Sequence, residues 1–394
     1  MRLGRRDCFA NAPCNLLVLV AIISLLVGCT KTPVQKIPEL EGLSYSHTLP
    51  LEYAMAFRAD FYEKPSTDGS VQSPFILLTV LNSDRYLLVP ENQNAPQNLP
   101  AEIKIINLPV KNAYLAASSA MSLICAFDSL ESIKFSAIQK KDWHIEAPAH
   151  AMENGSFLYA GKYNSPDFEL LLKENCPLAL ESTMIYHNPQ ILEKLESLGI
   201  TVFVDKSSFE EHPLGRLEWI KLYGLLFGKS DEANAFFDRQ IEKLNLDAES
   251  EKTEIEPKTV TFFYITANGM VVIRGSDDYI VKMIELAGGK YAFSQTRKSK
   301  SPSVQISMEQ FYAQSANADI LIYNSAIDNS IDSVQELVQK NPLFAEFKAV
   351  KEGQVWATGK YLYQATDRIG DMILDLRKIV DGRGEATLFL EKVE

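Results

Sequence analysis

The sequence predicts a two-lobed α/β protein in which a rigid helical bridge joins two lobes with mostly parallel sheets. Hydrophobic strand-like segments alternate with amphipathic helical segments both before and after the middle of the chain, and this alternation favours parallel strands with covered faces. The middle itself, residues 214–246, is typical of two consecutive helices with a single break. At 394 residues, 46% of them hydrophobic, the chain is long enough to form two cores.

The first 28 residues have the features of an export signal. A head with three arginines precedes an apolar run at residues 16–27, which is too short to span a bilayer comfortably. The run ends in the letters LVGC and resembles a bacterial lipoprotein signal, which implies cleavage before Cys29 and lipid attachment to that residue. Residues 29–46 would then form a tether. The alternative is an ordinary secretory signal with a chance cysteine.

Charge and cysteine content limit the classes of function. The formal net charge is −12, and removal of the signal takes away three arginines and one aspartate, which makes the charge −14. An acidic chain of this kind argues against a nucleic-acid partner, which would need a basic face. Beyond Cys29 only Cys125 and Cys176 remain, and their apolar surroundings favour free thiols over a disulfide.

Residues 47–229 are predicted to form the N-terminal lobe, with a small antiparallel β element at its start. Alternating hydrophobic segments there are typical of half-buried strands, and the letters NSD at residues 82–84 are the clearest hairpin turn. The strand-helix alternation of the lobe proper begins near residue 103, and Ser118 and Ser119 are expected to cap its first helix. In such sheets ligands bind outside the carboxyl ends of the strands.

The bridge and the C-terminal lobe follow. Gly228 is expected to end the first of the two middle helices, because glycine tolerates the left-handed conformation of a helix end. The second helix, the bridging helix at residues 230–246, begins with an acidic turn that suits the helix dipole. The charged run at residues 247–258 is predicted to be an exposed linker, and residues 259–394 repeat the strand-helix alternation as a second α/β lobe.

From about residue 53 to residue 380 the chain resembles the substrate-binding proteins of ABC importers for iron-siderophore, haem and cobalamin. It is most similar to lipoproteins of this family that carry a PLGRLEW-like segment before the bridging helices, here residues 213–219. The resemblance implies a ligand cleft between the lobes, an ABC permease as partner and a monomer anchored by lipid on the extracytoplasmic side of the cell membrane. The expected ligand is a metal chelate or tetrapyrrole, namely a ferric siderophore, haem or cobalamin, and no cofactor is expected.

The same resemblance implies that one glutamate in each lobe docks onto arginines of the permease. Glu169 and Glu309 match, because each stands at the start of a short helix that precedes a buried strand. The sequence departs from the family pattern in two places: Cys176-Pro177 replaces the usual Pro-Asp, and two extra residues follow in the second lobe. The alternative is a pair of ordinary first-turn glutamates favoured by the helix dipole.

The candidate ligand-binding residues lie at strand ends that face the expected cleft. Aromatic rings would stack on a corrin, porphyrin or catecholate, and arginine would pair with carboxylate or phosphate groups. The candidates are Ser118, Ser119, Trp143, Tyr163, Tyr186, Tyr264, Arg274, Arg297, Tyr323, Tyr361 and Tyr363. For any single tyrosine, packing with a satisfied hydroxyl remains the alternative, and for Arg297 it is a solvated basic loop.

Other classes of function have less support. The five histidines form no i, i+4 pair and have no CxxC partner, so we expect no site for a free metal ion. The motifs of α/β-hydrolases, P-loop NTPases, HExxH metalloproteases and dinucleotide-binding enzymes are absent, so we expect no catalytic residues. An enzyme or a ligand sensor with the same two-lobed fold remains the alternative.

Overall fold

The part of the chain that the structure describes contains three large β-sheets, the helices that connect their strands, and two consecutive helices in the middle of the chain. This computed structural model describes residues 37–65, 72–250, 256–295, 303–328, 331–383 and 389–394. Within these ranges no helix is long and apolar enough to cross a membrane. The predicted signal, Cys29 and Arg297 lie outside the described residues.

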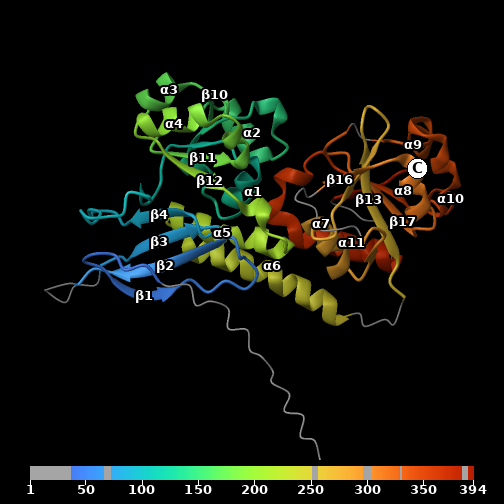
Figure 1. Cartoon of the computed structure of the whole chain (residues 1–394), viewed down its shortest axis with the longest axis horizontal. Coiled ribbons are helices and arrows are strands. Elements are labelled where there is room, and N and C mark those ends of the chain that lie inside the picture. Colours follow the sequence, from blue (N-terminus) through green and yellow to red (C-terminus); the bar gives the residue numbers. More distant parts are fainter. Residues whose placement is uncertain (1–36, 66–71, 251–255, 296–302, 329–330, 384–388) are drawn as a thin grey trace, which may run out of the picture. The chain divides into compact units, whose positions relative to one another are not determined.

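The first sheet contains five strands and precedes both lobes in the chain (Figure 1, blue to cyan). They are β1 (Ser44–Thr48), β2 (Phe57–Glu63), β3 (Phe75–Val80), β4 (Asp84–Val89) and β5 (Ile103–Asn107). The predicted hairpin is confirmed: Leu81 and Asn82 join β3 to β4 with φ angles of 46° and 60°. The strand expected to open the lobe proper, β5, instead pairs in parallel with β4 in this sheet. The long connection after β4 makes this possible, because it returns the chain to the same end of the sheet.

The second sheet belongs to the N-terminal lobe, and all its pairings are parallel, in the order β12-β11-β6-β7-β8. Its strands are β6 (Ala113–Leu115), β7 (Ile133–Ser136), β8 (Leu158–Tyr159), β11 (Leu178–Ser182) and β12 (Thr201–Asp205). The intervening helices are α1 (Ser118–Ala126), α2 (Glu146–Glu153), α3 (Phe168–Lys173) and α4 (Pro189–Ser197), and a short hairpin is made by β9 (Gly161–Lys162) and β10 (Ser165–Pro166). The predicted cap of α1 is wrong: Ala117 is the N-cap residue, and no side chain caps this helix.

The two middle helices are α5 (Pro213–Phe227) and α6 (Ser230–Ser250). Gly228 ends α5 in the left-handed conformation, with φ 71°, as predicted. Helix α5 is buried on nearly every side, a wider burial than one apolar face requires. Helix α6 continues to Ser250, so the helical part extends into the run that was expected to be linker. Its 21 residues span about 30 Å at 1.5 Å per residue.

The third sheet forms the C-terminal lobe and is parallel at its centre, where β13 (Thr259–Ile265) pairs with β17 (Ile320–Tyr323), which pairs with β18 (Val355–Thr358). The short β15 (Lys290–Tyr291) also runs parallel to β13. The antiparallel strands are β14 (Val271–Arg274), β16 (Ser303–Ile306) and β19 (Leu390–Lys392). The predicted turn at residues 267–269 joins β13 to β14, with Gly269 at φ 79°.

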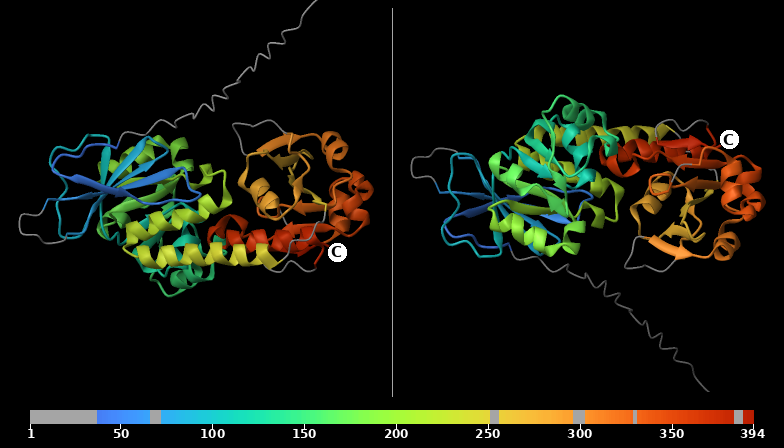
Figure 2. Two further views of the ribbon diagram at one scale, coloured as in Figure 1. Left: turned by 90° about the horizontal axis from the view of Figure 1, so that it is seen from below. Right: turned by 90° about the horizontal axis from the view of Figure 1, so that it is seen from above.

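The helices of this lobe connect it to the middle pair. They are α7 (Tyr279–Leu286), α8 (Met308–Ser315), α9 (Val334–Lys340), α10 (Lys348–Lys351) and α11 (Ile369–Asp381). Helix α11 contacts α5, α6 and α7, and both views of Figure 2 show it running beside α6. Helical packing of α11 against α5 and α6 therefore connects the C-terminal lobe to the bridge.

Both cysteines within the described residues are free thiols, as predicted. Burial raises the pKa of Cys125 to about 12 and that of Cys176 to about 11. Thiols with such high pKa values hold almost no thiolate at neutral pH, so both are structural rather than reactive groups.

Candidate functional site

A cavity of about 250 Å³ lies where the two lobes meet at the bridge. Its lining comes from the carboxyl ends of β6 and β12, from the start of α5 and α7, and from the segment before α11. This position agrees with the rule that ligands of α/β proteins bind outside the carboxyl ends of the strands. The lining residues are Ser118, Ser119, Ser207, Ser208, Arg216, Tyr279, Leu362, Tyr363, Ala365, Thr366, Ile369 and Met372.

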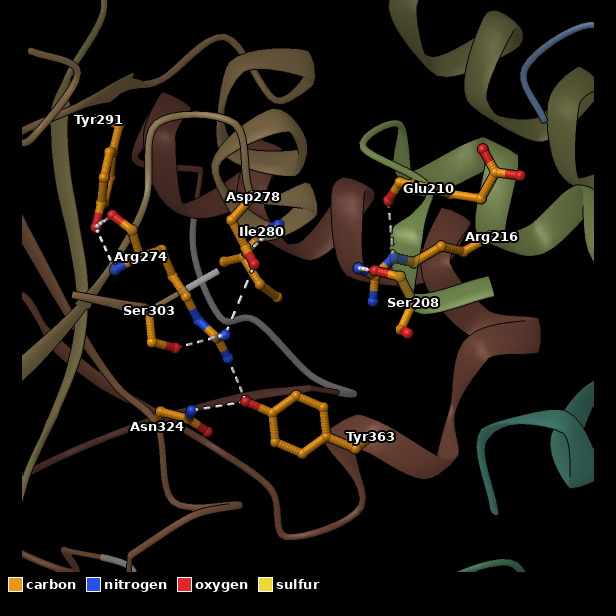
Figure 3. A network of polar contacts seen from close by, with 10 residues as sticks. All are labelled: Ser208, Glu210, Arg216, Arg274, Asp278, Ile280, Tyr291, Ser303, Asn324 and Tyr363. Carbon is orange, nitrogen blue, oxygen red and sulfur yellow. Dashed lines mark hydrogen bonds and ion pairs between the residues drawn. The ribbon is translucent and has the colours of Figure 1, made fainter. Parts of the chain in front are cut away.

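Arg216 reaches this cavity from the first turns of α5. Its Nε donates to the Glu210 carbonyl oxygen at 3.1 Å and its Nη2 to the Ser208 carbonyl oxygen at 2.7 Å, as Figure 3 shows. The guanidinium carbon lies 3.5 Å from the centroid of the Tyr279 ring, a cation–π contact from α5 to α7. Burial lowers the pKa of Arg216, but a guanidinium stays cationic at neutral pH.

Arg274 is the second cation, at the end of β14. Its Nη2 donates to the Tyr363 hydroxyl, and its Nη1 lies 3.4 Å from Ser303 Oγ and 3.7 Å from Asp278 Oδ2 (Figure 3). Burial alone would lower the pKa of Arg274, but Tyr363 and Asp278 outweigh burial and raise it. The side chain is thus held as a cation at the end of a strand.

A second set of contacts holds this arginine in place. The Tyr291 hydroxyl accepts the Arg274 backbone N–H at 3.0 Å and donates to the Arg274 carbonyl at 3.1 Å. Asn324 Nδ2 donates to the Tyr363 hydroxyl at 2.9 Å, so the group that Arg274 contacts is itself oriented. Two oriented guanidiniums with adjacent tyrosine rings can bind carboxylate or phosphate groups carried by an apolar or aromatic ligand.

The PLGRLEW segment also has a structural explanation. The buried Glu218 carboxylate accepts backbone N–H groups of Glu52, Tyr53 and Ala54 at 2.8–3.1 Å and the Lys221 ammonium at 2.8 Å. These bonds attach the chain that enters β2 to helix α5. Glu218 therefore stabilises the fold. Within the PLGRLEW segment only Arg216 lines the cavity.

Comparison with known proteins decides the family. The sequence profile described as periplasmic binding protein matches residues 137–362. The chain belongs to the periplasmic binding protein family. Proteins of this family bind substrates for ABC importers and are not known as enzymes, which fits the two-lobed architecture with a cavity at the lobe junction.

Three individual proteins illustrate what the chain is similar to. An uncharacterized lipoprotein of Methanocaldococcus jannaschii is 24% identical over 84% of this chain and 81% of its own length. A periplasmic binding protein of Veillonella parvula superposes with a TM-score of 0.57 at 17% identity, covering 70% of this chain and 93% of its own. A periplasmic heme-binding protein of Vibrio cholerae has a TM-score of 0.56 at 16% identity, covering 68% of this chain and 98% of its own. At these identities the structural likeness shows the fold alone.

The structure of this periplasmic binding protein brings some of the predicted ligand-binding residues together. Ser118, Ser119 and Tyr363 line the cavity, and Arg274 contacts Tyr363. Tyr361 stands two residues before Tyr363, and its half-buried ring packs on Phe389 with centroids 5.4 Å apart. These residues come from both lobes, as a site at the lobe junction requires.

Other predicted residues do not line the cavity. Trp143 is buried beside Phe157, with ring centroids 6.1 Å apart, and Tyr323 is buried with its hydroxyl donating to Asp328 at 2.5 Å. The remaining three are exposed or half-buried elsewhere in the described residues: Tyr163 and Tyr264 pack on core clusters, and Tyr186 is 48% exposed with Lys206 5.7 Å from its ring centroid. These residues therefore lie away from this cavity, and their part in ligand binding stays a prediction.

Sequence reasoning missed Arg216 and Tyr279. Arg216 stands in the segment that carries the family resemblance, and Tyr279 directly follows the two aspartates after Arg274. Both are helical residues, whereas the ligand-binding residues predicted from sequence lie at strand ends. The cation–π pair between them becomes visible only when α5 and α7 are seen to pack together.

Glu169 and Glu309 occupy equivalent places in the two lobes. Each is the second residue of its helix, α3 or α8, and each is exposed. Asp167 caps α3, and Ser307 caps α8 in a capping box with Gln310. A hydrogen bond with Ser307 lowers the pKa of Glu309, so this carboxylate is charged at neutral pH.

Proposed function

We propose that this protein is a membrane-anchored, extracytoplasmic substrate-binding protein that captures an anionic metal chelate or tetrapyrrole and delivers it to an ABC permease. Membership of the periplasmic binding protein family supports a role in import. The lipoprotein-like signal ending at Cys29 and the relatives that are named lipoproteins support a lipid anchor.

The observation that carries the choice of ligand is the pair of guanidiniums at the lobe junction. Arg216 lines the cavity beside Tyr279, and Arg274 contacts Tyr363, so each cation is paired with an aromatic side chain. Ferric siderophores and haem carry negative charge on an aromatic or macrocyclic body, which is the chemistry this pairing fits. At about 250 Å³ the cavity has room for an anionic substituent rather than for a whole macrocycle.

Titration of the purified protein with haem, ferric siderophores, cobalamin and cobinamide tests the proposal. A true ligand at about a hundredfold its dissociation constant should stabilise the fold by about 2.7 kcal/mol, seen as a shift of the unfolding temperature. Arg274→Lys should weaken binding at least about tenfold, because lysine cannot make the bidentate contact. The exposed substitution Arg239→Lys on α6 is the matched control. If folded protein binds none of these compounds, this choice of ligand is wrong.

We also propose that Glu169 and Glu309 dock onto the permease. The two glutamates occupy equivalent positions and are exposed, and side-chain caps fix the start of α3 and of α8. These observations support one fixed negative charge on each lobe. Charge pairs at an interface set orientation and association rate. Because both residues lie apart from the cavity lining, their role in docking is separable from ligand capture.

A further inference from the structure

A second and larger cavity, of about 660 Å³, lies between the segments that flank β2 and β3 of the first sheet and the region of α7. Its walls are residues 53–56, the β3–β4 turn, residues 209–212 and residues 276–285. It adjoins the first cavity at the contact between Arg216 and Tyr279, because the neighbours of these residues, Glu210 and Asp278, line the second cavity. The β3–β4 turn and the segment before β2 line this cavity and not the first.

The walls of this cavity are held in place by buried carboxylates. Glu210 accepts the backbone N–H groups of Met55 and Ala56 at 2.9 Å and 2.8 Å and the Trp219 indole N–H at 2.9 Å. Glu218 holds the preceding residues in the same way. All five backbone N–H groups of residues 52–56 thus donate to carboxylates on α5 or in the loop before it. A cavity with fixed walls loses little entropy when a ligand binds.

Large apolar side chains are exposed at this cavity. Met55 is 91% exposed and Phe209 is 57% exposed, and both belong to the lining. The Tyr53 ring stacks on His212 with centroids 4.9 Å apart, which presents a flat aromatic surface beside them. Exposed methionine and aromatic side chains around a hollow are typical of a binding surface.

The charge of the lining selects the ligand. Five carboxylates line the cavity against a single ammonium group, Lys282, which is paired with Glu285 at 3.0 Å. Burial and the neighbouring Lys282 lower the pKa of His212, so this ring adds no positive charge at neutral pH. The side chains of Glu211 and Asp277 make no hydrogen bond or ion pair with any described residue, and both face the cavity as lining residues.

These features distinguish an organic cation from a metal ion. Among the described residues no three side chains of the metal-binding kind lie close enough to hold a metal ion. The carboxylates are instead spread around an aromatic and apolar surface, an arrangement that suits a cationic group carried on an apolar body.

We propose that this second cavity binds a small organic cation, with a primary amine or guanidinium at Glu211 and Asp277 and its aliphatic body against Met55, Phe209 and Tyr53. This site has the opposite charge preference to the anionic site at Arg216 and Arg274. It is independent of the proposed function, because the two sites share no lining residue.

Isothermal titration of the full chain in detergent, at neutral pH and low salt, tests this proposal. The probes are 1,5-diaminopentane and agmatine, with 1,5-pentanediol as the uncharged analogue of similar length. The double variant Glu211→Gln, Asp277→Asn removes the two carboxylates that make no hydrogen bond or ion pair with a described residue. The matched control, Glu193→Gln with Asp238→Asn, makes the same change of charge at two exposed positions outside the lining.

We expect both cations to bind and the diol not to bind. The double variant should bind the cations at least about tenfold more weakly, because charge-assisted hydrogen bonds are lost, whereas the control variant should bind them as the wild type does. The proposal is overturned if folded wild-type protein binds neither cation, if the diol binds equally well, or if the double variant retains the wild-type affinity. Binding that is lost equally in both variants would indicate a general charge effect and also overturns it.

Discussion

Replacement of Glu181 by glutamine should remove one pH-dependent contribution to the stability of this protein. Glu181 lies in β11, an interior strand of the second sheet, and its side chain is fully buried. Neither carboxylate oxygen has a hydrogen-bond partner among the described residues. Burial therefore raises the pKa of Glu181 from its ordinary value of 4.5 to about 8.

The sign and size of the effect follow from this difference in pKa. At pH 7 the folded protein holds Glu181 neutral, whereas the unfolded chain ionises it, so ionisation favours unfolding. The stability that the neutral Glu181 carboxyl contributes is fully present below pH 4.5 and is lost as the pH rises towards 8. At 1.36 kcal/mol per pH unit the loss reaches about 3 kcal/mol by pH 7. Glutamine is neutral in both states and so removes this slope.

Urea unfolding at pH 5, 6, 7 and 8, followed by circular dichroism, measures the effect. The free energy of unfolding of Glu181→Gln minus that of the wild type should increase by about 2 to 3 kcal/mol between pH 5 and pH 7. Glu193→Gln, at an exposed position on α4, serves as a control and should give a difference that does not change with pH. A pH-independent difference for Glu181→Gln would refute the argument that this carboxyl is neutral in the folded state.

Three further predictions concern the bridge and the lobes. Glu218→Gln should destabilise the fold by about 3–5 kcal/mol, because a buried charge network is broken, and calorimetry should show a lower unfolding temperature. Gly224→Ala should cost about 1–3 kcal/mol in urea unfolding, because the added Cβ would lie 2.7 Å from Ala233 Cβ where α5 meets α6; an unchanged midpoint would contradict this packing argument. Glu169→Gln combined with Glu309→Gln should reduce ligand uptake by cells while ligand affinity in titration stays unchanged, and normal uptake would disprove docking through these residues.

The elements that could be predicted from sequence are those with local signals. Gly228 ends α5 because glycine readily adopts the left-handed conformation that a helix end requires. The NSD hairpin turn likewise depends on residues at the turn itself. The pairing of β5 with β4 has no such local signal. The sequence of residues 103–107 is compatible with a strand in either the first or the second sheet. Only the tertiary fold decides which sheet this strand joins.

The burial of α5 shows a second limit. Its sequence contains Glu218 and Lys221, which a periodicity argument places on a solvated face. In the structure these two side chains pair at 2.8 Å inside the protein, and Glu218 also satisfies backbone N–H groups of a segment more than 160 residues earlier in the chain. Buried polar residues can be recognised from sequence only if the partner is known, and this partner is the backbone.

The candidate site could be predicted in part for the same reason. Arg274 and Tyr363 were found because they follow strands of the C-terminal lobe, where ligand-binding residues gather. Arg216 was not found, because its place beside Tyr279 depends on how α5 packs against α7. That contact also separates the two cavities, one beside two arginines and one whose charged lining residues are mostly carboxylates. If each cavity binds its own class of ligand, Arg216→Met should weaken the binding of anions and leave the binding of diaminopentane within about twofold of wild type, because a factor of two corresponds to less than 0.5 kcal/mol. Loss of both activities would mean that the Arg216–Tyr279 contact supports both cavities as one site.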